Sequence, residues 1–291
     1  MIPSRIGAVG AGSTVVRISA NQTDYNLRTA LGSPSGAKRI VVLIDSGVTI
    51  SSSSAGTPAF DEGAGWASGT TISIVNEGSI YGAGGAGGKG GDTNSDTAVY
   101  AAGAAGAAGG TALKLTVPTT ITNASGNIFG GGGGGGGGSS AVIGLDGGES
   151  GSEAAWSGGG GGGGGRGTVT SAAGARGTCS GAYMDPDRYE NGVAGSTGNF
   201  SSAGSGGTGG DTPYYWYTPH TLTGADGGAG GDWGTAGSTA SAATESAPAT
   251  GGLSQYSQAS GGAAGKAVDL NGQTVSWISG NDGTHVKGAV A

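Results

Sequence analysis

The sequence is poor in charge, in cysteine and in long apolar runs. Lysine, arginine, aspartate and glutamate make up 11% of the 291 residues, and the net charge is −7. The one cysteine, Cys179, has no partner for an intrachain disulfide. No stretch reaches the ~20 apolar residues of a membrane span, and residues 1–13 are too polar and glycine-rich for a signal peptide. We therefore expect no membrane insertion, and a protein made in the cytoplasm that leaves the cell by lysis or within a particle.

Proline is also scarce, with 8 residues, whereas glycine dominates, with 72. Collagen needs a strict G-X-Y period and abundant proline, and neither is present. Plain disorder fits poorly, because disordered chains have few aromatic residues and a high net charge. This chain has five tryptophans and nine tyrosines, and they are interleaved with the glycine runs. The composition therefore favours an ordered surface over a flexible tether.

The charge is unevenly distributed along the chain. Residues 1–60 carry a net charge of +3, and the remainder carries −10. An acidic outer part argues against nucleic acid as a partner, because the phosphate backbone is bound through clusters of cations. A charge that serves only solubility explains the same balance.

The first 80 residues have the pattern of a small β-rich domain. Residues 40–44 (IVVLI) form a β-branched apolar stretch that is typical of a buried strand. Residues 15–18 contain a shorter apolar run, and residues 72–80 place apolar positions around an Asn-Glu-Gly turn signal. We therefore predict an N-terminal β-domain over residues 1–80.

Glycine is concentrated in residues 81–265, which hold 57 of the 72 glycines, including nine in a row at 130–138 and eight at 158–165. Three segments around these runs share an order of strand, polar turn, second short strand and small residues. Such self-similarity is typical of a repetitive scaffold, in which the chain leaves a β-layer, makes glycine-rich excursions and returns. The three segments are residues 70–81, 112–129 and 267–291, and residues 266–291 are predicted to form a closing β-segment.

The glycine runs predict a bundle of polyglycine II helices over residues 81–265. This extended threefold helix is of the polyproline II type and rises about 3.1 Å per residue. Its backbone groups point outward, so helices that pack side by side can bond to one another. Only glycine allows backbones to approach so closely. We expect a glycine-rich sandwich in which backbone hydrogen bonds replace a hydrophobic core, and a mobile glycine linker is the alternative.

Long turns at one end of such a bundle can vary without disturbing it, and they are therefore candidates for binding. The longest insertions with little glycine are residues 178–190, 211–223 and 238–249. Residues 211–223 (DTPYYWYTPHTLT) concentrate aromatic side chains, which dominate binding hot spots because rigid rings give contact area at low entropic cost. Alternatively, these rings pack over the bundle as a lid. The candidate binding residues are Tyr214, Tyr215, Trp216, Tyr217 and His220, with Tyr183 and Tyr189 of the first insertion.

No catalytic, metal or cofactor motif rises above the background of this composition. GxGxxG matches are expected by chance, and none lies between a clear strand and a helix. His220 and His285 belong to no metal-ligand pattern, and the acidic residues 185–190 (DPDRYE) fit a solvated loop or, alternatively, a calcium site. Glycoside hydrolysis needs two juxtaposed carboxylates, and no pair stands out. We predict a protein that is not an enzyme and uses no cofactor or metal.

The glycine-rich units resemble a known family. NEGSIYGAGGAGGKGG, NASGNIFGGGGGGGGG and the closing GGAAGKAVDLNGQTVSWISGNDGTHVKGAVA are similar to the distal modules of phage tail-fibre and tail-tip adhesins, and the resemblance covers residues 65–291. It implies a virion protein at the tail tip whose distal loops bind a bacterial surface receptor, either an outer-membrane protein or a glycan. It also implies that the N-terminal domain binds other phage tail proteins, and that the protein is a homotrimer or sits on a threefold fibre.

Other classes of protein stay open at this stage. The main alternative is a glycine-rich scaffold of a virion or cell surface without receptor contact, although a wall protein is expected to carry an export signal. An ice-binding protein needs a flat repeating face, which irregular aromatic loops interrupt. A capsule depolymerase needs a carboxylate pair in a groove. Substitutions within residues 213–220 separate an adhesin from a scaffold, because binding changes in the former while the fold survives.

Overall fold

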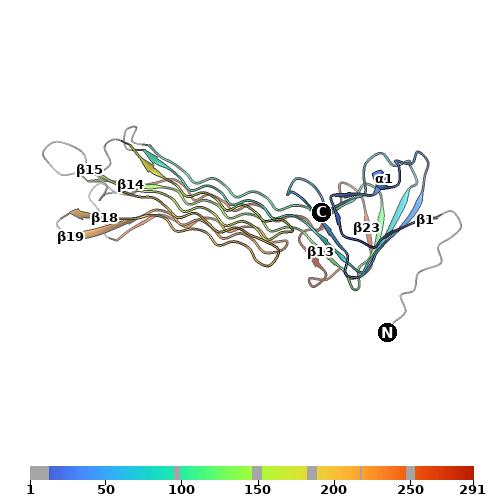
Figure 1. Cartoon of the computed structure of the whole chain (residues 1–291). Coiled ribbons are helices and arrows are strands. Elements are labelled where there is room, and N and C mark those ends of the chain that lie inside the picture. The colour runs from blue at the N-terminus through green and yellow to red at the C-terminus, as the bar shows by residue number, and fades with distance from the viewer. Residues whose placement is uncertain (1–12, 95–98, 146–152, 182–188, 217, 247–252) are drawn as a thin grey trace.

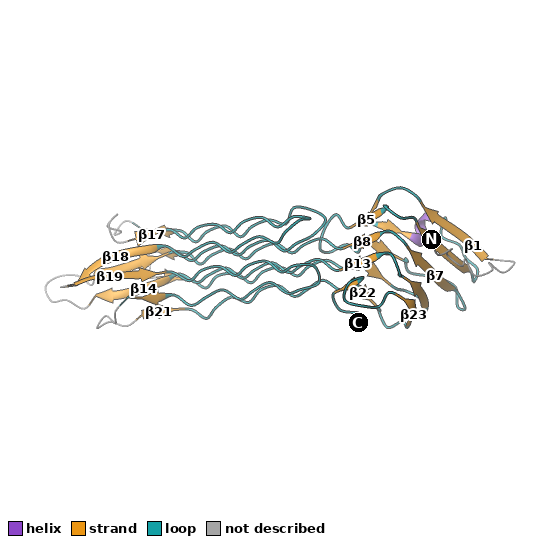
Figure 2. Ribbon diagram, turned by 90° about the horizontal axis from the view of Figure 1, so that it is seen from below, coloured by secondary structure: helices purple, strands orange, loops and turns teal. Residues whose placement is uncertain are grey.

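The computed structural model describes residues 13–94, 99–145, 153–181, 189–216, 218–246 and 253–291. The molecule is elongated (Figure 1). Three parallel sheets form one end, here called the proximal end; extended segments run side by side through the middle; and further short strands form the opposite, distal end (Figure 2). Within the described part, α1 (Leu27–Ala30) is the helix, and no helix is long and apolar enough to cross a membrane. The prediction of a mainly β protein is confirmed.

The three proximal sheets consist of parallel strands. Their orders are β1-β4-β7-β12-β23, β2-β5-β8-β13-β24 and β22-β11-β6-β3. The strands of the first sheet are β1 (Ser13–Ile18), β4 (Arg39–Ile44), β7 (Thr71–Asn76), β12 (Thr119–Thr122) and β23 (Val275–Ser279). Those of the second are β2 (Gln22–Thr23), β5 (Thr49–Ser51), β8 (Ser79–Tyr81), β13 (Asn127–Phe129) and β24 (Val286–Lys287). Those of the third are β3 (Tyr25–Asn26), β6 (Phe60–Asp61), β11 (Leu113–Lys114) and β22 (Val268–Asp269).

The chain visits these sheets in a fixed order and therefore winds as a three-sided solenoid. β1, β2 and β3 make the first turn, and β4, β5 and β6 make the second. The third turn passes from β8 to β11 through residues 82–112, and the fourth passes from β13 to β22 through residues 130–267. In the last turn, a parallel bridge between Val268 and Val290 follows β23 and β24. The glycine-rich stretches are thus two insertions at the same corner of the solenoid.

Strands on both sides of residue 80 share these sheets. β7 and β8 pair with β12 and β13, which pair in turn with β23 and β24. The residues that precede the first glycine run and those that close the chain therefore belong to the same sheets, and residues 113–129 lie between them.

Alternating apolar side chains of these strands form the main hydrophobic core. In β4, Ile40, Val42 and Ile44 are buried, and the residues between them are only partly covered. The register places Val42 beside Ile74 and Ile74 beside Ile121, so that β-branched side chains stack from turn to turn. Complete burial of one such side chain contributes about 1.5–3 kcal/mol. Residues 40–44 are therefore one strand with a single core-facing side.

Asparagine side chains bridge successive turns at one corner of the solenoid. Asn76, at the end of β7, donates from Nδ2 to Asn123 Oδ1 over 2.7 Å. Asn123 in turn donates from Nδ2 to the carbonyl oxygens of Gly280 (3.2 Å) and His285 (3.3 Å). Both asparagines are buried, and these bonds satisfy polar groups that would otherwise be unpaired in the core.

A buried carboxylate connects two other turns. Glu62 accepts hydrogen bonds from the amides of Thr116 (2.7 Å) and Val117 (3.2 Å) and from Thr119 Oγ1 (2.5 Å). Its side chain is fully buried. Burial raises the pKa of Glu62 to about 6, although the hydrogen bonds act in the opposite direction.

The glycine-rich segments are held together by backbone hydrogen bonds, with N···O distances of 2.7–3.2 Å. Bonds to a given neighbour recur at every third residue. Gly131, Gly134 and Gly137, for example, donate to the carbonyls of Gly110, Ala107 and Ala104. The segments are residues 82–91, 101–110, 130–140, 158–166, 171–177, 192–198, 204–210, 224–231, 235–243 and 259–265.

The two uninterrupted glycine runs lie in the interior. Residues 130–138 and 158–165 are buried throughout. Each of these two segments has six neighbours, because three segments accept its N–H groups and three others donate to its carbonyl oxygens. The neighbours of segment 130–140 are 101–110, 158–166 and 235–243 as acceptors, and 82–91, 224–231 and 259–265 as donors.

Glycine is required wherever a Cβ atom would point at the backbone of a neighbouring segment. A Cβ atom on Gly134 would lie less than 3.0 Å from the Ala86 carbonyl oxygen, a separation that real Cβ atoms essentially never show. Other segments have glycine at fewer positions, and residues 171–177 and 192–198 have it at every third position only. In segment 101–110, Gly106 faces Gly134, whereas Ala105 is exposed. The alternation of glycine with alanine, serine or lysine therefore records which side of a segment faces the interior.

An aromatic cluster joins the glycine segments to the solenoid. Tyr81 ends β8 and Phe129 ends β13, each directly before a glycine segment. Trp233, in a short proximal turn, stacks on Tyr81 with ring centroids 5.1 Å apart, and Phe200 of another turn contacts both Tyr81 and Trp233. The Arg166 guanidinium lies 5.4 Å from the centre of the Trp233 ring and pairs with Asp232 over 2.7 Å. The cluster fixes the bundle against the sheets.

Candidate functional site

The long connections between glycine segments lie at the distal end. They are residues 92–100, 141–157, 178–191, 211–223 and 244–258, here called the distal loops. The turns that return directly to the bundle at the proximal end, residues 167–170, 199–203 and 232–234, are short. The distal strands are β9 (Thr93–Asn94), β10 (Val99–Tyr100), β14 (Ala141–Leu145), β15 (Glu153–Ser157), β16 (Cys179–Ser180), β17 (Tyr189–Glu190), β18 (Asp211–Trp216), β19 (Thr218–Thr223), β20 (Thr244–Glu245) and β21 (Leu253–Gln255).

The loop that connects the two interior segments occupies the centre of this end. Its strands β14 and β15 pair with each other, and their outer neighbours are β21 and β17, from two other loops. β18, β19 and β20 form a second sheet, and β10, β9 and β16 form a third. Ile143, Ala155, Leu222 and Ala243 belong to a small apolar cluster beneath these strands. The distal loops are therefore one packed surface and not independent tethers.

The predicted aromatic insertion is a β-hairpin at the distal end (Figure 1). Tyr214, Tyr215 and Trp216 lie on β18, and His220 lies on β19, where its backbone is opposite Tyr214. The base of the hairpin is anchored by the buried Thr212, whose Oγ1 donates to the Trp156 carbonyl over 2.8 Å. Tyr217 lies outside the described residues.

The other predicted residues divide in the same way. Tyr189 lies on β17, paired with Trp156 of β15, and its side chain is half-buried. β17 contacts β18, so Tyr189 and the hairpin share one end of the molecule. Tyr183 and most of the acidic segment 185–190 lie outside the described residues. Contact between the aromatic rings of the hairpin and a partner stays a prediction, as does the alternative in which the rings cover the bundle.

A second aromatic site was missed by the sequence reasoning. Tyr100, at the end of β10, packs against Tyr256, which follows β21, with ring centroids 5.0 Å apart. Tyr256 is 49% exposed. The two residues come from different loops, 92–100 and 244–258, and each is an isolated tyrosine in the sequence. The local signal is only that Tyr100 directly precedes the segment 101–110, as Tyr81 and Phe129 precede theirs, and that Tyr256 lies shortly before the segment 259–265.

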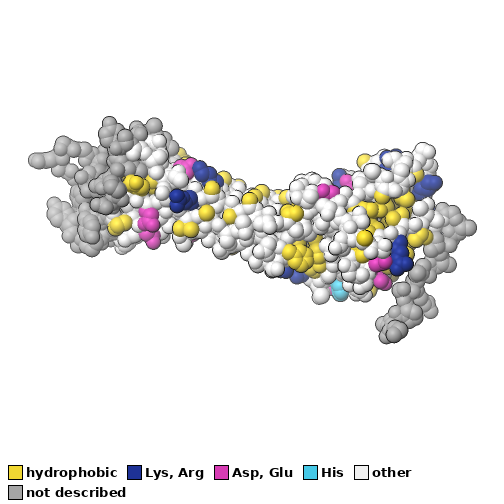
Figure 3. Space-filling view, viewed as in Figure 1, with side chains coloured by type: hydrophobic (Ala, Val, Ile, Leu, Met, Phe, Trp, Pro, Cys, Tyr) yellow, Lys and Arg dark blue, Asp and Glu magenta, His cyan; other side chains and the backbone are white. Residues whose placement is uncertain are grey.

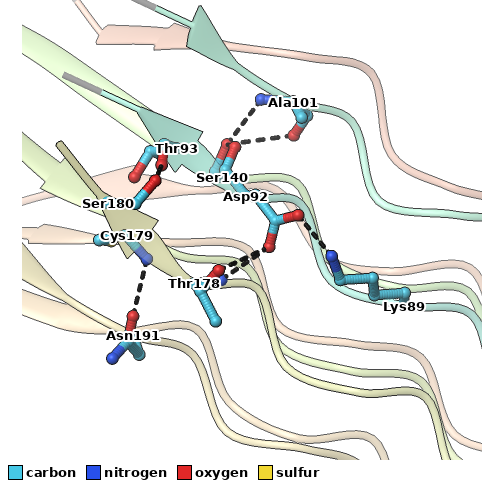
Figure 4. A network of polar contacts seen from close by, with 9 residues as sticks. All are labelled: Lys89, Asp92, Thr93, Ala101, Ser140, Thr178, Cys179, Ser180 and Asn191. Atoms are coloured by element: carbon cyan, nitrogen blue, oxygen red, sulfur yellow. Dashed lines mark hydrogen bonds and ion pairs between the residues drawn. The ribbon is translucent and has the colours of Figure 1, made fainter. Parts of the chain in front are cut away.

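Polar side chains tie the distal loops together where the glycine segments end (Figure 4). Asp92 pairs with Lys89 and accepts hydrogen bonds from the amide and hydroxyl of Thr178 (2.9 and 3.0 Å). Ser140 Oγ donates to the Asp92 carbonyl over 2.9 Å and accepts from the Ala101 amide over 2.8 Å. Partial burial acts to raise the pKa of Asp92, but the bonds from Lys89 and Thr178 outweigh it and leave that pKa below its usual value.

Side chains of the types that can hold a metal ion are spread across the described part of the chain. Among the described residues, no group of three or more His, Cys, Asp or Glu side chains is placed to hold a metal ion. The half-buried Cys179 is hydrogen-bonded to its surroundings, with its amide donating to Asn191 Oδ1 over 2.7 Å. Burial raises the pKa of the Cys179 thiol, which makes it a poor nucleophile.

Comparison with known proteins agrees with this architecture. Residues 13–291 match the family model described as phage tail fibre adhesin Gp38. The fold is similar to that in the crystal structure of the gp37-gp38 adhesin tip complex of the bacteriophage S16 long tail fiber, with a TM-score of 0.52 and 22% sequence identity, over 96% of this chain and 82% of that chain. The search of curated protein sequences gave no match. Because the family model spans nearly the whole chain, this protein belongs to the Gp38 family of phage tail fibre adhesins.

Proposed function

We propose that this phage adhesin contacts its bacterial receptor through the distal loops, and that the aromatic hairpin 211–223 and the Tyr100–Tyr256 pair supply contact area. The observation that carries this proposal is the segregation of long and short connections. The distal loops lie at the end farthest from the proximal sheets, and the short turns pack against these proximal sheets. Tyr256 is 49% exposed, and an exposed tyrosine ring gives contact area at low entropic cost, which suits a binding surface.

The bundle between the two ends is proposed to be a polyglycine II sandwich. Three features support this assignment: hydrogen bonds that recur at every third residue, neighbours on all sides of the interior segments, and no positive φ at their glycines. A threefold extended helix gives this periodicity, because its backbone groups point outward in three directions. Such a bundle would serve as a stiff spacer that carries the loops away from the fibre.

The proximal end is proposed to attach the adhesin to another tail protein, as a domain built around residues 1–80. The similar S16 structure is a complex of gp37 with gp38, which supports a tail fibre protein as the partner. The outer side of the first sheet carries exposed apolar side chains: Val15 is 48% exposed, Ile278 is 69% exposed, and Val41, Leu43 and Val75 are partly exposed. Figure 3 shows hydrophobic side chains gathered over the proximal sheets, while the middle of the molecule is nearly free of charge.

The remaining parts of the proposal concern the whole particle. We propose that the chain is not an enzyme, that it is made in the host cytoplasm, and that it is released within virions by lysis. The homotrimer and the threefold fibre stay predictions, and the mass of the purified protein in solution tests the first of them.

The proposal is tested by the binding of purified protein to cells of the strain that the parent phage infects. Tyr256→Ser removes an exposed ring at the distal end, and a second variant changes both Tyr214 and Trp216 to serine. We expect saturable binding by the wild type and at least about tenfold weaker binding by one of the variants, as for a hot-spot residue. Circular dichroism and melting should not change.

Ile278→Ser is the matched control, because Ile278 is also an exposed apolar residue but lies at the proximal end. It should leave cell binding unchanged. Binding by the wild type that survives both distal variants would move receptor contact away from these aromatic residues. No binding to the host by the wild type would favour a scaffold role without receptor contact.

A further inference from the structure

Asp92 lies where the regular bonding of the bundle ends and the distal loops begin. Gly91 makes the last hydrogen bond from segment 82–91 to segment 130–140, with its amide donating to the Gly138 carbonyl over 2.8 Å. The Thr93 amide donates to the Thr178 carbonyl over 2.9 Å, where the pairing of β9 with β16 in the loop 178–191 begins. Beyond these residues, short strand pairs replace the threefold bonding of the bundle, and side chains add further contacts between the loops.

One residue supplies contacts to three loops at this boundary (Figure 4). The Asp92 carboxylate receives both the amide and the hydroxyl of Thr178, which opens the loop 178–191. The Asp92 carbonyl receives Ser140 Oγ, which directly precedes the central loop 141–157. Asp92 itself opens the loop 92–100, and Lys89 pairs with its second carboxylate oxygen.

Neighbouring contacts extend the same connection. Ser140 Oγ also accepts from the Ala101 amide, so the far side of the loop 92–100 is tied to the central loop. Ser180 Oγ donates to the Thr93 carbonyl over 3.2 Å, beside the parallel pairing of β9 with β16. The low pKa of the Asp92 carboxyl keeps it ionised near neutral pH, where hydrogen bonds to a charged acceptor are stronger than neutral ones.

We propose that Asp92 is a positioning residue of the receptor-binding surface. It connects the first residues of the loops 92–100 and 178–191 to Ser140, which precedes the loop 141–157, and so fixes these three loops relative to one another. This inference rests on the proposed function, because it assumes that the distal loops contact the receptor. Asp92 itself does not need to touch the receptor. Binding is weaker when loops lose conformational entropy on contact, and contacts that fix the loops in the free protein reduce this loss.

The test combines the binding of purified variants to host cells with amide hydrogen exchange. Asp92→Ala removes the acceptor for Thr178 and the partner of Lys89. We expect about tenfold weaker binding and faster exchange at the Thr93 and Thr178 amides. The melting temperature of the bundle should stay unchanged, because the interior hydrogen bonds do not involve this side chain. Asp92→Asn keeps an acceptor oxygen and should restore most of the affinity.

Asp269→Ala is the matched control. Asp269 pairs with Lys266 three residues earlier, as Asp92 does with Lys89, but it lies at the proximal end. It should change neither binding nor exchange at the distal loops. Thr178→Val removes only the hydroxyl hydrogen bond and should act in the same direction with a smaller effect, and it decides the matter if Asp92→Ala does not fold.

The outcomes separate this inference from the proposed function. A wild type that binds while Asp92→Ala binds equally well overturns the positioning role and leaves the proposed function standing. Faster exchange in Asp92→Ala without weaker binding has the same meaning. A wild type that does not bind its host overturns the proposed function, and with it the role of Asp92 in receptor contact.

Discussion

The proximal end and the glycine bundle solve the same folding problem in opposite ways. The solenoid buries stacked isoleucine and valine side chains, with Ile50, Ile74, Ile80, Ile121 and Ile128 all nearly or fully inaccessible. The interior of the bundle has no side chains to bury, and its buried residues 130–138 and 158–165 are all glycine. There, every backbone N–H group and most carbonyl oxygens are hydrogen-bonded to other parts of the chain. One region is stabilised by burying side chains and the other by their absence.

This difference predicts which amino-acid substitutions each region tolerates. Folding must offset the loss of conformational entropy, which is largest for glycine. A hydrophobic core does so with apolar burial and accepts a substitution of similar volume. A backbone lattice does so with closely spaced hydrogen bonds, and any added atom on an inward position separates the segments. The two regions should therefore respond differently to substitution.

Gly134→Val should be the most damaging change. The added Cβ would meet the Ala86 carbonyl oxygen, and both hydrogen bonds of Gly134, to Ala107 and from Gly262, would have to break or lengthen. We expect a loss of more than about 4 kcal/mol of stability, or no folded protein. Ala105→Val, on the exposed side of segment 101–110, should cost less than about 0.5 kcal/mol. Equal melting of the two variants would refute the requirement for glycine.

Trp233→Ala should separate the two regions. Trp233 is 4% exposed and stacks between the ends of strands β8 and β13, which lead into the bundle. Its removal should cost about 3–5 kcal/mol, as for other large-to-small changes at buried aromatic residues. Urea unfolding followed by far-UV circular dichroism should change from one transition to two. A single unshifted transition would mean that the junction does not couple the regions.

Glu62 should make the solenoid less stable as the pH rises. Its pKa is about 6 in the folded protein and 4.5 in an unperturbed chain. The folded state therefore holds the proton more tightly, so this stabilisation is complete below pH ~4.5 and is lost as pH rises through about 6, a change of about 2 kcal/mol. Unfolding experiments from pH 4.5 to 6.5 measure it. Glu62→Gln should flatten the slope, and a slope that persists in this variant must arise from other groups.

The surface ion pair on the first sheet should matter least. Arg17 Nε lies 2.9 Å from the Asp45 carboxylate, and the arginine side chain is 69% exposed. Arg17→Ala should cost less than about 1 kcal/mol, because solvent screens exposed pairs. Thermal melts at low and high salt should agree in the variant. A larger loss would show that polar contacts stabilise the solenoid as strongly as they do the bundle.

Much of the organisation was readable from the sequence because it depends on local patterns. The change at residue 82 from apolar alternation to glycine marks the point where the chain leaves the solenoid, directly after β8. The shared order of strand, turn and strand in residues 70–81 and 112–129 reflects two turns of the same solenoid. The parallel pairing was not predicted, because Ile128 meets Ile80 and Val286, partners that are distant in sequence. Strands of two or three residues carry no signal for such pairing.

The candidate site was only partly readable. Residues 211–223 were singled out through their aromatic composition, which is a local signal, whereas their hairpin structure was not predicted. The Tyr100–Tyr256 pair and the Asp92 contacts were missed, because each joins loops that are far apart along the chain. Single tyrosines and aspartates have many roles, and only their neighbours in space distinguish them.

The sequence by itself determined which segments can be interior. Residues 130–138 and 158–165 lack any Cβ over their whole length, and only such segments can be enclosed by backbone on all sides. The tertiary structure decided which loops meet. Each glycine segment connects the proximal end with the distal end. The position of a loop therefore follows from where the two segments that it joins are packed in the bundle. That order is set by hydrogen bonds between identical backbones, which no side-chain pattern records.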